Sequence, residues 1–159
     1  MNVQPAAAQT NNNGARKQRF VDAHLADVEK GAEQLGVPVE NILGLSALES
    51  TWGEHRFAAQ GNNYFGIHYP ALFATGYVLS AGGTKVATFA SYADSLRSFT
   101  AISGSIVQGK RDPKAFAAAL QNSGKFGIDI RTGAKLPGYV GDVAGTIRGI
   151  RSIVARRRI

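Results

Sequence analysis

Apolar residues recur at steps of three and four along several segments of this chain, and no other feature constrains its fold as strongly. The last segment is the clearest, with a stripe made of Val140, Val143, Ile147, Ile150 and Val154. Such spacing is typical of amphipathic helices that bury one face in a shared core. The same pattern predicts helices over residues 17–35, from Pro38 through Glu49, and from Ser91 through Ile106. An N-cap aspartate followed by a first-turn proline, Asp112-Pro113, predicts a short helix over residues 113–120.

One short segment departs from this helical pattern. Gly82 and Gly83 separate residues 77–80 from residues 84–89, which predicts a small β-hairpin with a glycine turn. We expect irregular backbone over residues 53–70 and 123–138. The fold class predicted is therefore mainly α, a helical bundle with one small β-lobe. Residues 1–15 are expected to be a flexible leader, and residues 16–159 one domain with a basic C-terminal helix.

Composition excludes several classes of protein. With 44% apolar and 18% charged residues the chain has the makeup of a folded domain, and no apolar run approaches the ~20 residues of a membrane span. The absence of cysteine excludes disulfides and thiolate zinc sites, and His24, His55 and His68 lack metal-ligand spacing. We expect no metal and no cofactor. The N-terminus lacks the features of a classical signal peptide.

The net charge of +7 is concentrated near the C-terminus. No acidic residue follows Asp142, whereas five arginines do: Arg148, Arg151, Arg156, Arg157 and Arg158. Such a helix favours an anionic surface, for example lipid headgroups, a wall polymer or nucleic acid. Alternatively, the arginines simply complement the negative end of the helix dipole.

Glu49 is the most informative single residue. It lies seven residues after Ile42 and four after Leu45, so it projects from the apolar face of its helix. Burial and the negative helix end would both raise the pKa of its carboxyl group. A carboxylic acid that stays protonated near neutral pH can serve as a general acid. The alternative is a helix-end glutamate that turns to solvent or caps a loop.

Two neighbouring motifs carry a family resemblance. Residues 47–53 end the glutamate's helix, and nine residues later comes the block Asn62-Asn63-Tyr64-Phe65-Gly66-Ile67. Together they resemble the glucosaminidases of glycoside hydrolase family 73, which cut bacterial cell-wall glycan. The resemblance covers residues 19–153 and implies a lysozyme-like fold, with Glu49 as general acid. It also implies that Asn63 and Tyr64 contact the substrate.

The resemblance suggests further residues for the substrate cleft. Trp52 could form a sugar platform or anchor the core, and the latter is favoured. His68 follows the block and is expected to border the cleft. Tyr139 matches a family tyrosine that lines the site, although it could instead pack the last helix.

A second catalytic carboxylate is not evident. The family often carries an acid in the hairpin, and residues 77–89 contain none. Asp94 is a candidate, but Ser91 and Asp94 have the spacing of a helix capping box. A 2-acetamido group of the substrate could replace the missing carboxylate, since substrate assistance is a known exception to the two-carboxylate scheme.

These observations predict a hydrolase of peptidoglycan that cuts a β-1,4 bond as an endo-β-N-acetylglucosaminidase. A muramidase or a lytic transglycosylase remains an alternative, as does a non-catalytic basic module that binds wall polymer or nucleic acid. The partners expected are glycan strands and, through the arginine-rich end, an anionic envelope surface, with no nucleic acid. We expect a monomer that acts in the periplasm or outside the cell after phage release or a dedicated secretion route.

Overall fold

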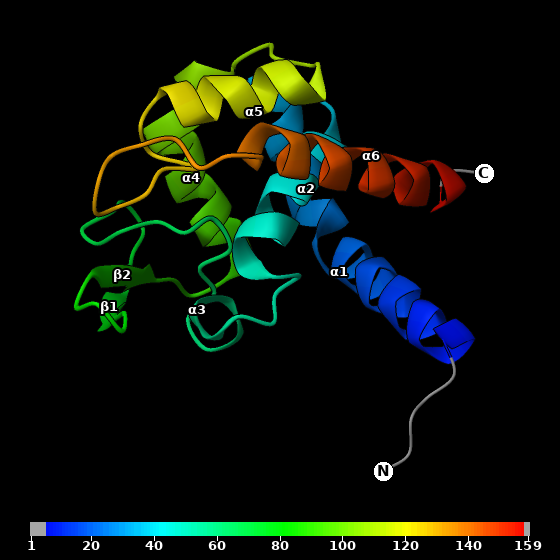
Figure 1. Ribbon diagram of the computed structural model, residues 1–159, viewed down its shortest axis with the longest axis horizontal. Coiled ribbons are helices and arrows are strands. Elements are labelled where there is room, and N and C mark those ends of the chain that lie inside the picture. Colours follow the sequence, from blue (N-terminus) through cyan, green and yellow to red (C-terminus); the bar gives the residue numbers. More distant parts are fainter. Residues whose placement is uncertain (1–5, 158–159) are drawn as a thin grey trace.

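The computed structural model describes residues 6–157 of the chain, with side chains from residue 12 onward. Six helices and a two-stranded sheet make up this part, as Figure 1 shows. The helices are α1 (Ala6–Leu35), α2 (Val39–Ser50), α3 (Arg56–Ala59), α4 (Tyr92–Val107), α5 (Pro113–Asn122) and α6 (Tyr139–Arg157), and the strands are β1 (Gly76–Leu79) and β2 (Lys85–Thr88). The predicted fold class, mainly α with a small β-lobe, is confirmed.

Helix α2 lies at the centre of the molecule. Its side chains Ile42, Leu43 and Leu45 are fully buried, and α1 and α6 pack on either side of it. At Gly44 a Cβ atom would lie 2.6 Å from Cγ1 of Ile147, so only glycine permits this close approach of α2 to α6. The apolar face of α2 is therefore enclosed by the helices on which the rest of the fold is built.

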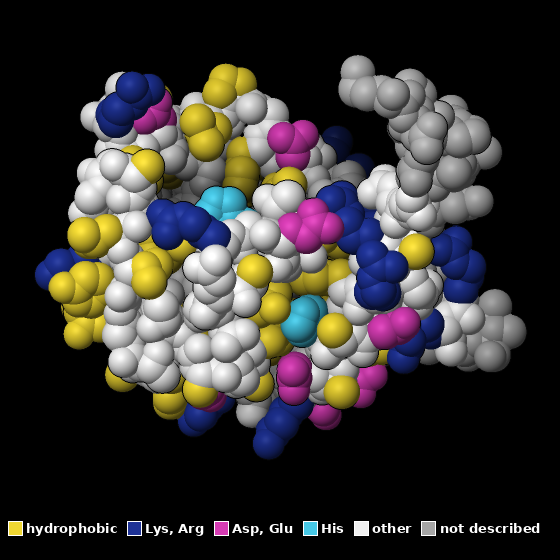
Figure 2. Space-filling model, turned by 90° about the horizontal axis from the view of Figure 1, so that it is seen from below, with side chains coloured by type: hydrophobic (Ala, Val, Ile, Leu, Met, Phe, Trp, Pro, Cys, Tyr) yellow, Lys and Arg dark blue, Asp and Glu magenta, His cyan; other side chains and the backbone are white. Residues whose placement is uncertain are grey.

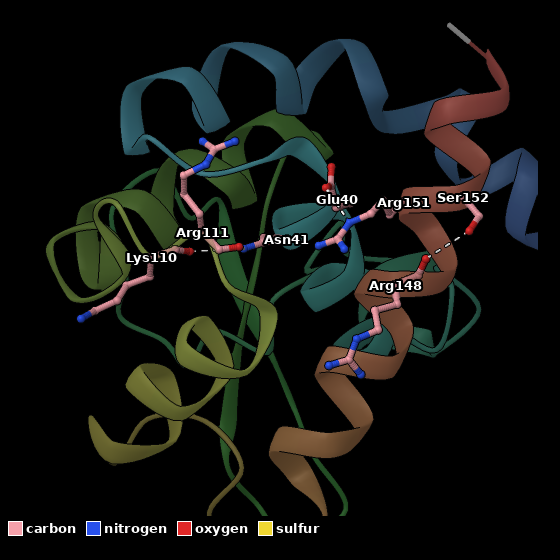
Figure 3. A network of polar contacts seen from close by, with 7 residues as sticks. All are labelled: Glu40, Asn41, Lys110, Arg111, Arg148, Arg151 and Ser152. Carbon is pink, nitrogen blue, oxygen red and sulfur yellow. Dashed lines mark hydrogen bonds and ion pairs between the residues drawn. The ribbon is translucent and has the colours of Figure 1, made fainter. Parts of the chain in front are cut away.

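Polar contacts join the N-terminal end of α2 to the neighbouring segments of the chain, as Figure 3 shows. The Glu40 carboxylate lies 3.2 Å from Nε of Arg151, which joins the first turn of α2 to α6. Nδ2 of Asn41 donates to the backbone oxygens of Lys110 and Arg111, between α4 and α5. These contacts hold α2 in place at its N-terminal end, away from Glu49.

Helix α1 begins earlier than predicted. The sequence suggested a flexible leader over residues 1–15 and a helix from Lys17, whereas the backbone is helical from Ala6 onward. Alanine and glutamine are strong helix formers, so residues 6–9 can extend the helix. Residues 1–5 of that leader lie outside the described residues.

The β-lobe projects from one end of the bundle, on the left in Figure 1. Strands β1 and β2 are antiparallel, with Tyr77 opposite Ala87 and Leu79 opposite Lys85. A bridge between His68 and Val86 adds a third extended segment on the other side of β2. The predicted hairpin is present, and β2 lies between β1 and the segment that contains His68.

Among the described residues, no helix is both long and apolar enough to cross a membrane.

Candidate active site

Glu49 lies in the last turn of α2, where the helix stops at a left-handed turn. Thr51 and Trp52 have φ of 51° and 55°, and the backbone N–H of Trp52 donates to the Ala47 oxygen at 2.7 Å. This turn ends the helix immediately after the glutamate. The side chain thereby reaches a cavity of about 870 Å³ that α2, α4, the 65–68 segment, the 124–136 loop and the start of α6 enclose.

Among the described residues, one donor holds the carboxyl group of Glu49. The Tyr139 hydroxyl donates to Oε1 of Glu49 at 3.2 Å. Burial raises the pKa of Glu49 to about 7, and this hydrogen bond opposes the rise. The carboxyl group can therefore carry a proton near neutral pH, as a general acid must.

Gly66 leaves space beside the second oxygen of Glu49. Its φ is +64°, and a Cβ there would lie 3.3 Å from Oε2. Within the described part of the chain, no hydrogen-bond donor reaches Oε2, which borders the cavity together with Gly66. Among the described residues, Oε2 is thus the carboxyl oxygen without a protein donor, on a side chain that lines the cavity.

Tyr139 begins α6 and is itself buried. Gly127, with φ of +62°, lies flat against its ring, since a Cβ would approach Cγ of Tyr139 to 2.4 Å. Burial and the neighbouring Glu49 raise the pKa of Tyr139 well above its usual range. The hydroxyl consequently remains a donor toward Glu49 throughout the physiological pH range.

Asn63 has a different place from the one suggested by the resemblance. Its side chain is buried, and Nδ2 donates to the backbone oxygens of Ile67 and Ala87, both at 2.8 Å. Its Oδ1 accepts from the backbone N–H groups of Phe65 and Ile67. With both ends of the amide bonded to the backbone, Asn63 shapes the turn that brings Gly66 to the cavity.

Tyr64 and Trp52 pack in an aromatic cluster and are absent from the cavity wall. The Trp52 ring lies 5.6 Å from the Phe20 ring, and Tyr64 lies 4.8 Å from both His24 and Tyr92. Burial lowers the pKa of His24 to about 4, so this imidazole is neutral inside the cluster. The cluster supports the 62–67 turn from α1 and α4.

Apart from Glu49, the acidic residues on the cavity wall are not the one that the sequence suggested. His68 lines the cavity, whereas Asp94 does not. Its carboxylate lies 3.4 Å from Arg97, and its backbone N–H donates to Oγ of Ser91. Asp129 and Asp142, which the sequence did not single out, do line the cavity.

The two unexpected aspartates differ in their bonding. Oδ1 of Asp129 accepts from the backbone N–H of Arg131 at 2.9 Å, which shapes the 123–138 loop. Asp142 lies one turn after Tyr139 on α6, within its first turn. The sequence offered one signal for these two residues: Asp129 lies in the glycine-rich loop that precedes α6, and Asp142 follows that loop closely.

No group of three or more potential ligands for a metal ion is present in the described residues.

A family model described as glucosaminidase, mannosyl-glycoprotein endo-β-N-acetylglucosaminidase, matches residues 25–152. This chain belongs to the glucosaminidase family. It is therefore a glycoside hydrolase, and the match includes both Glu49 with its helix and Tyr139 with most of its helix. No curated protein sequence matches the chain.

Solved structures agree with the family assignment. A structure of a type VI secretion system effector–immunity complex from Pseudomonas protegens contains a chain with 39% identity and a TM-score of 0.78. The match covers 90% of this chain and 96% of that one. A peptidoglycan hydrolase from Sphingomonas sp. A1 has 26% identity and a TM-score of 0.70, with coverage of 87% and 94%.

The glycoside hydrolase domain of Salmonella typhimurium FlgJ shares the fold. Its TM-score is 0.65 at 22% identity, with 89% of this chain and 92% of that one covered. The expected lysozyme-like fold is thereby confirmed.

Proposed function

We propose that this glucosaminidase hydrolyses peptidoglycan, cutting the β-1,4 bond after GlcNAc in the GlcNAc–MurNAc backbone, with Glu49 as general acid. The observation that carries the proposal is a carboxyl group with a pKa of about 7 on a side chain that lines a cavity of about 870 Å³. The 26% identical relative from Sphingomonas is named a peptidoglycan hydrolase, which supports the substrate class.

The mechanism we propose relies on the substrate's own 2-acetamido group. Glu49 donates a proton to the leaving oxygen while the acetamido oxygen attacks the anomeric carbon. Water then opens the bound oxazolinium ring, and Glu49 accepts the proton from that water. Tyr139 is suitably placed to orient the acetamido group because its hydroxyl already lies beside Glu49. Asp94 lies outside the cavity wall, so the described structure offers no support for it as the second acid.

Digestion of purified sacculi followed by mass spectrometry tests the bond. New reducing ends on GlcNAc with retained configuration support the proposal, as does inhibition by thiazoline analogues of GlcNAc. Reducing MurNAc ends would indicate a muramidase, and anhydro-MurNAc ends would indicate a lytic transglycosylase. In either case the proposed bond would be wrong.

The same digestion with Glu49→Gln tests the general acid. Glutamine retains the volume and the acceptor for Tyr139 but cannot supply the proton, so we expect activity to fall by about 10²- to 10⁴-fold. Activity above about a tenth of the wild-type value would contradict the role of Glu49.

We further propose that the enzyme acts in the periplasm, delivered by a dedicated secretion route. The support is the 39% identical chain in the type VI effector–immunity complex. Fractionation of cells that export the protein, with and without a functional secretion apparatus, tests the route. Recovery from the periplasm independent of the apparatus would contradict it.

The arginine-rich end is proposed to strengthen contact with an anionic envelope surface. Two of its arginines are already paired, Arg151 with Glu40 and Arg157 with Asp22, so they join α6 to α2 and α1. Arg148 projects from α6 one turn before Arg151, as Figure 3 shows, and Arg148 and Arg156 are both exposed. Arg158 lies outside the described residues. Arg148→Gln should weaken binding to anionic vesicles at low salt, and unchanged binding would contradict this role.

A further inference from the structure

Large hydrophobic side chains are exposed mainly at the β-lobe. Of the eight exposed in the described part of the chain, six lie between residues 69 and 79, and the other two, Ile130 and Leu136, line the cavity. Hydrophobic side chains are visible on the left side of Figure 2, the end that carries the hairpin. A group of large hydrophobic side chains exposed together is more often a binding site than a surface without function.

Two tyrosines form the ordered part of this surface. The rings of Tyr69 and Tyr77 lie 5.0 Å apart, and both residues are more than a third exposed. Nζ of Lys85 lies 4.8 Å from the centre of the Tyr77 ring. We call these three residues the aromatic platform.

Strand register connects the aromatic platform to the cavity. The backbone N–H of Ala87 donates to the Ile67 oxygen and that of Tyr69 donates to the Lys85 oxygen, both at 3.0 Å. Ile67 and Tyr69 therefore lie on the same face of the three-segment ladder, the face that also carries Lys85 and Tyr77. Ile67 and His68, on opposite faces of the ladder, both line the cavity, and Tyr69 follows them directly in the chain, so the platform adjoins the edge of the cavity.

The segment of sequence that carries the aromatic platform has charges of one sign. No acidic residue occurs between Glu54 and Asp94, a stretch that contains Arg56 and Lys85. Nη2 of Arg56 donates to the Leu79 oxygen at 3.0 Å, so this second cation is held against β1. A surface that combines flat rings with unopposed cations suits a polymer that combines sugar rings with carboxylates.

We infer that the aromatic platform binds the peptide-bearing part of the glycan strand beyond the bond cut at Glu49. Tyr69 and Tyr77 stack on a sugar ring, and Lys85 pairs with a carboxylate of the lactyl-peptide stem. This inference rests on the proposed function, because it assigns a place to a further stretch of the same substrate. It predicts that the enzyme distinguishes strands that carry peptide stems from strands without them.

Binding in an inactive background tests the inference apart from turnover. Glu49→Gln protein is sedimented with intact sacculi and with glycan from which an amidase has removed the peptides and whose freed lactyl carboxyl groups have then been converted to amides. Adding Tyr77→Leu, which keeps apolar area without a flat ring, should weaken binding to both polymers by roughly three- to tenfold. Adding Lys85→Gln should weaken binding only to intact sacculi, by about two- to fivefold at low salt.

Lys114→Gln provides the matched control, since it makes the same charge change at an exposed site on α5. It should leave binding to both polymers unchanged. The inference is overturned if Lys85→Gln weakens binding to both polymers equally, or if Tyr77→Leu binds both normally. Normal binding of Tyr77→Leu to both polymers would indicate that the exposed hydrophobic face contacts a protein partner instead of glycan.

The two proposals fail in different ways. If platform variants made in the active enzyme bind and cut like wild type, the platform is wrong and the proposed function stands. If the wild-type enzyme releases no reducing ends from sacculi, the proposed function fails, whatever the sedimentation shows. Thermal melting of each variant confirms that the comparison is made between folded proteins.

Discussion

The buried carboxyl group of Glu49 should make the protein less stable as the pH rises. Its pKa is raised from 4.5 to about 7 in the folded state. Below pH 4.5 the group is neutral in both states and has no effect. Between pH 4.5 and about 7 the unfolded chain releases the proton and the folded chain keeps it, so the free energy of unfolding falls with pH.

The size of this effect follows from the same difference. At about 1.4 kcal/mol per pH unit, it corresponds to roughly 3 kcal/mol of stability lost above pH 7. Glutamine cannot ionise and still accepts the Tyr139 hydrogen bond. Glu49→Gln should therefore match wild type near pH 4 and exceed it by about 3 kcal/mol at pH 8, a rise in melting temperature on the order of 10 °C.

Urea unfolding of both proteins from pH 4 to pH 8 measures this difference directly. Glu33→Gln, at an exposed position of α1, controls for the general effect of removing a negative charge. A constant difference between Glu49→Gln and wild type across this range would refute the reasoning. It would mean that the carboxyl group ionises as readily in the folded state as in the unfolded chain.

Three further substitutions test the surroundings of Glu49. Tyr139→Phe removes the donor that opposes the raised pKa of Glu49, so the alkaline limb of the pH–rate profile should move to higher pH, and a move to lower pH would contradict this. Gly66→Ala places a methyl group 3.3 Å from Oε2 of Glu49, so kcat/KM should fall. Because φ is +64° at this position, the unfolding free energy should also drop by roughly 1–2 kcal/mol. Normal kinetics would show that the substrate does not occupy the space beside Oε2. Asp94→Asn should lower the unfolding free energy by only about 0.3–1 kcal/mol, the range for a carboxylate in the first turn of a helix, and should leave kcat unchanged. A large loss of kcat in a stably folded variant would instead make Asp94 the second acid.

Local sequence pattern determined the secondary structure and the most informative residue. The stripe that includes Ile147 and Ile150 predicts α6, and the paired glycines predict the hairpin, because both patterns depend only on near neighbours. The placement of Glu49 on an apolar helix face follows from the same spacing, and the structure agrees, since the carboxyl group is buried. The start of α1 was wrong because polar, alanine-rich residues have no apolar stripe to mark a helix.

Tertiary packing alone decided what surrounds that glutamate. Tyr139 reaches Glu49 across 90 positions of sequence, which required α6 to pack against α2 at Gly44. Asn63 has the residue type of a sugar ligand, yet its amide is bonded to the backbone of residues 65, 67 and 87. Asp142 is exposed yet lines the cavity, because it follows the buried Tyr139 by three residues on α6. Periodicity reports which face of an element is apolar, but a cavity is formed where several such faces end, and that depends on how the elements pack.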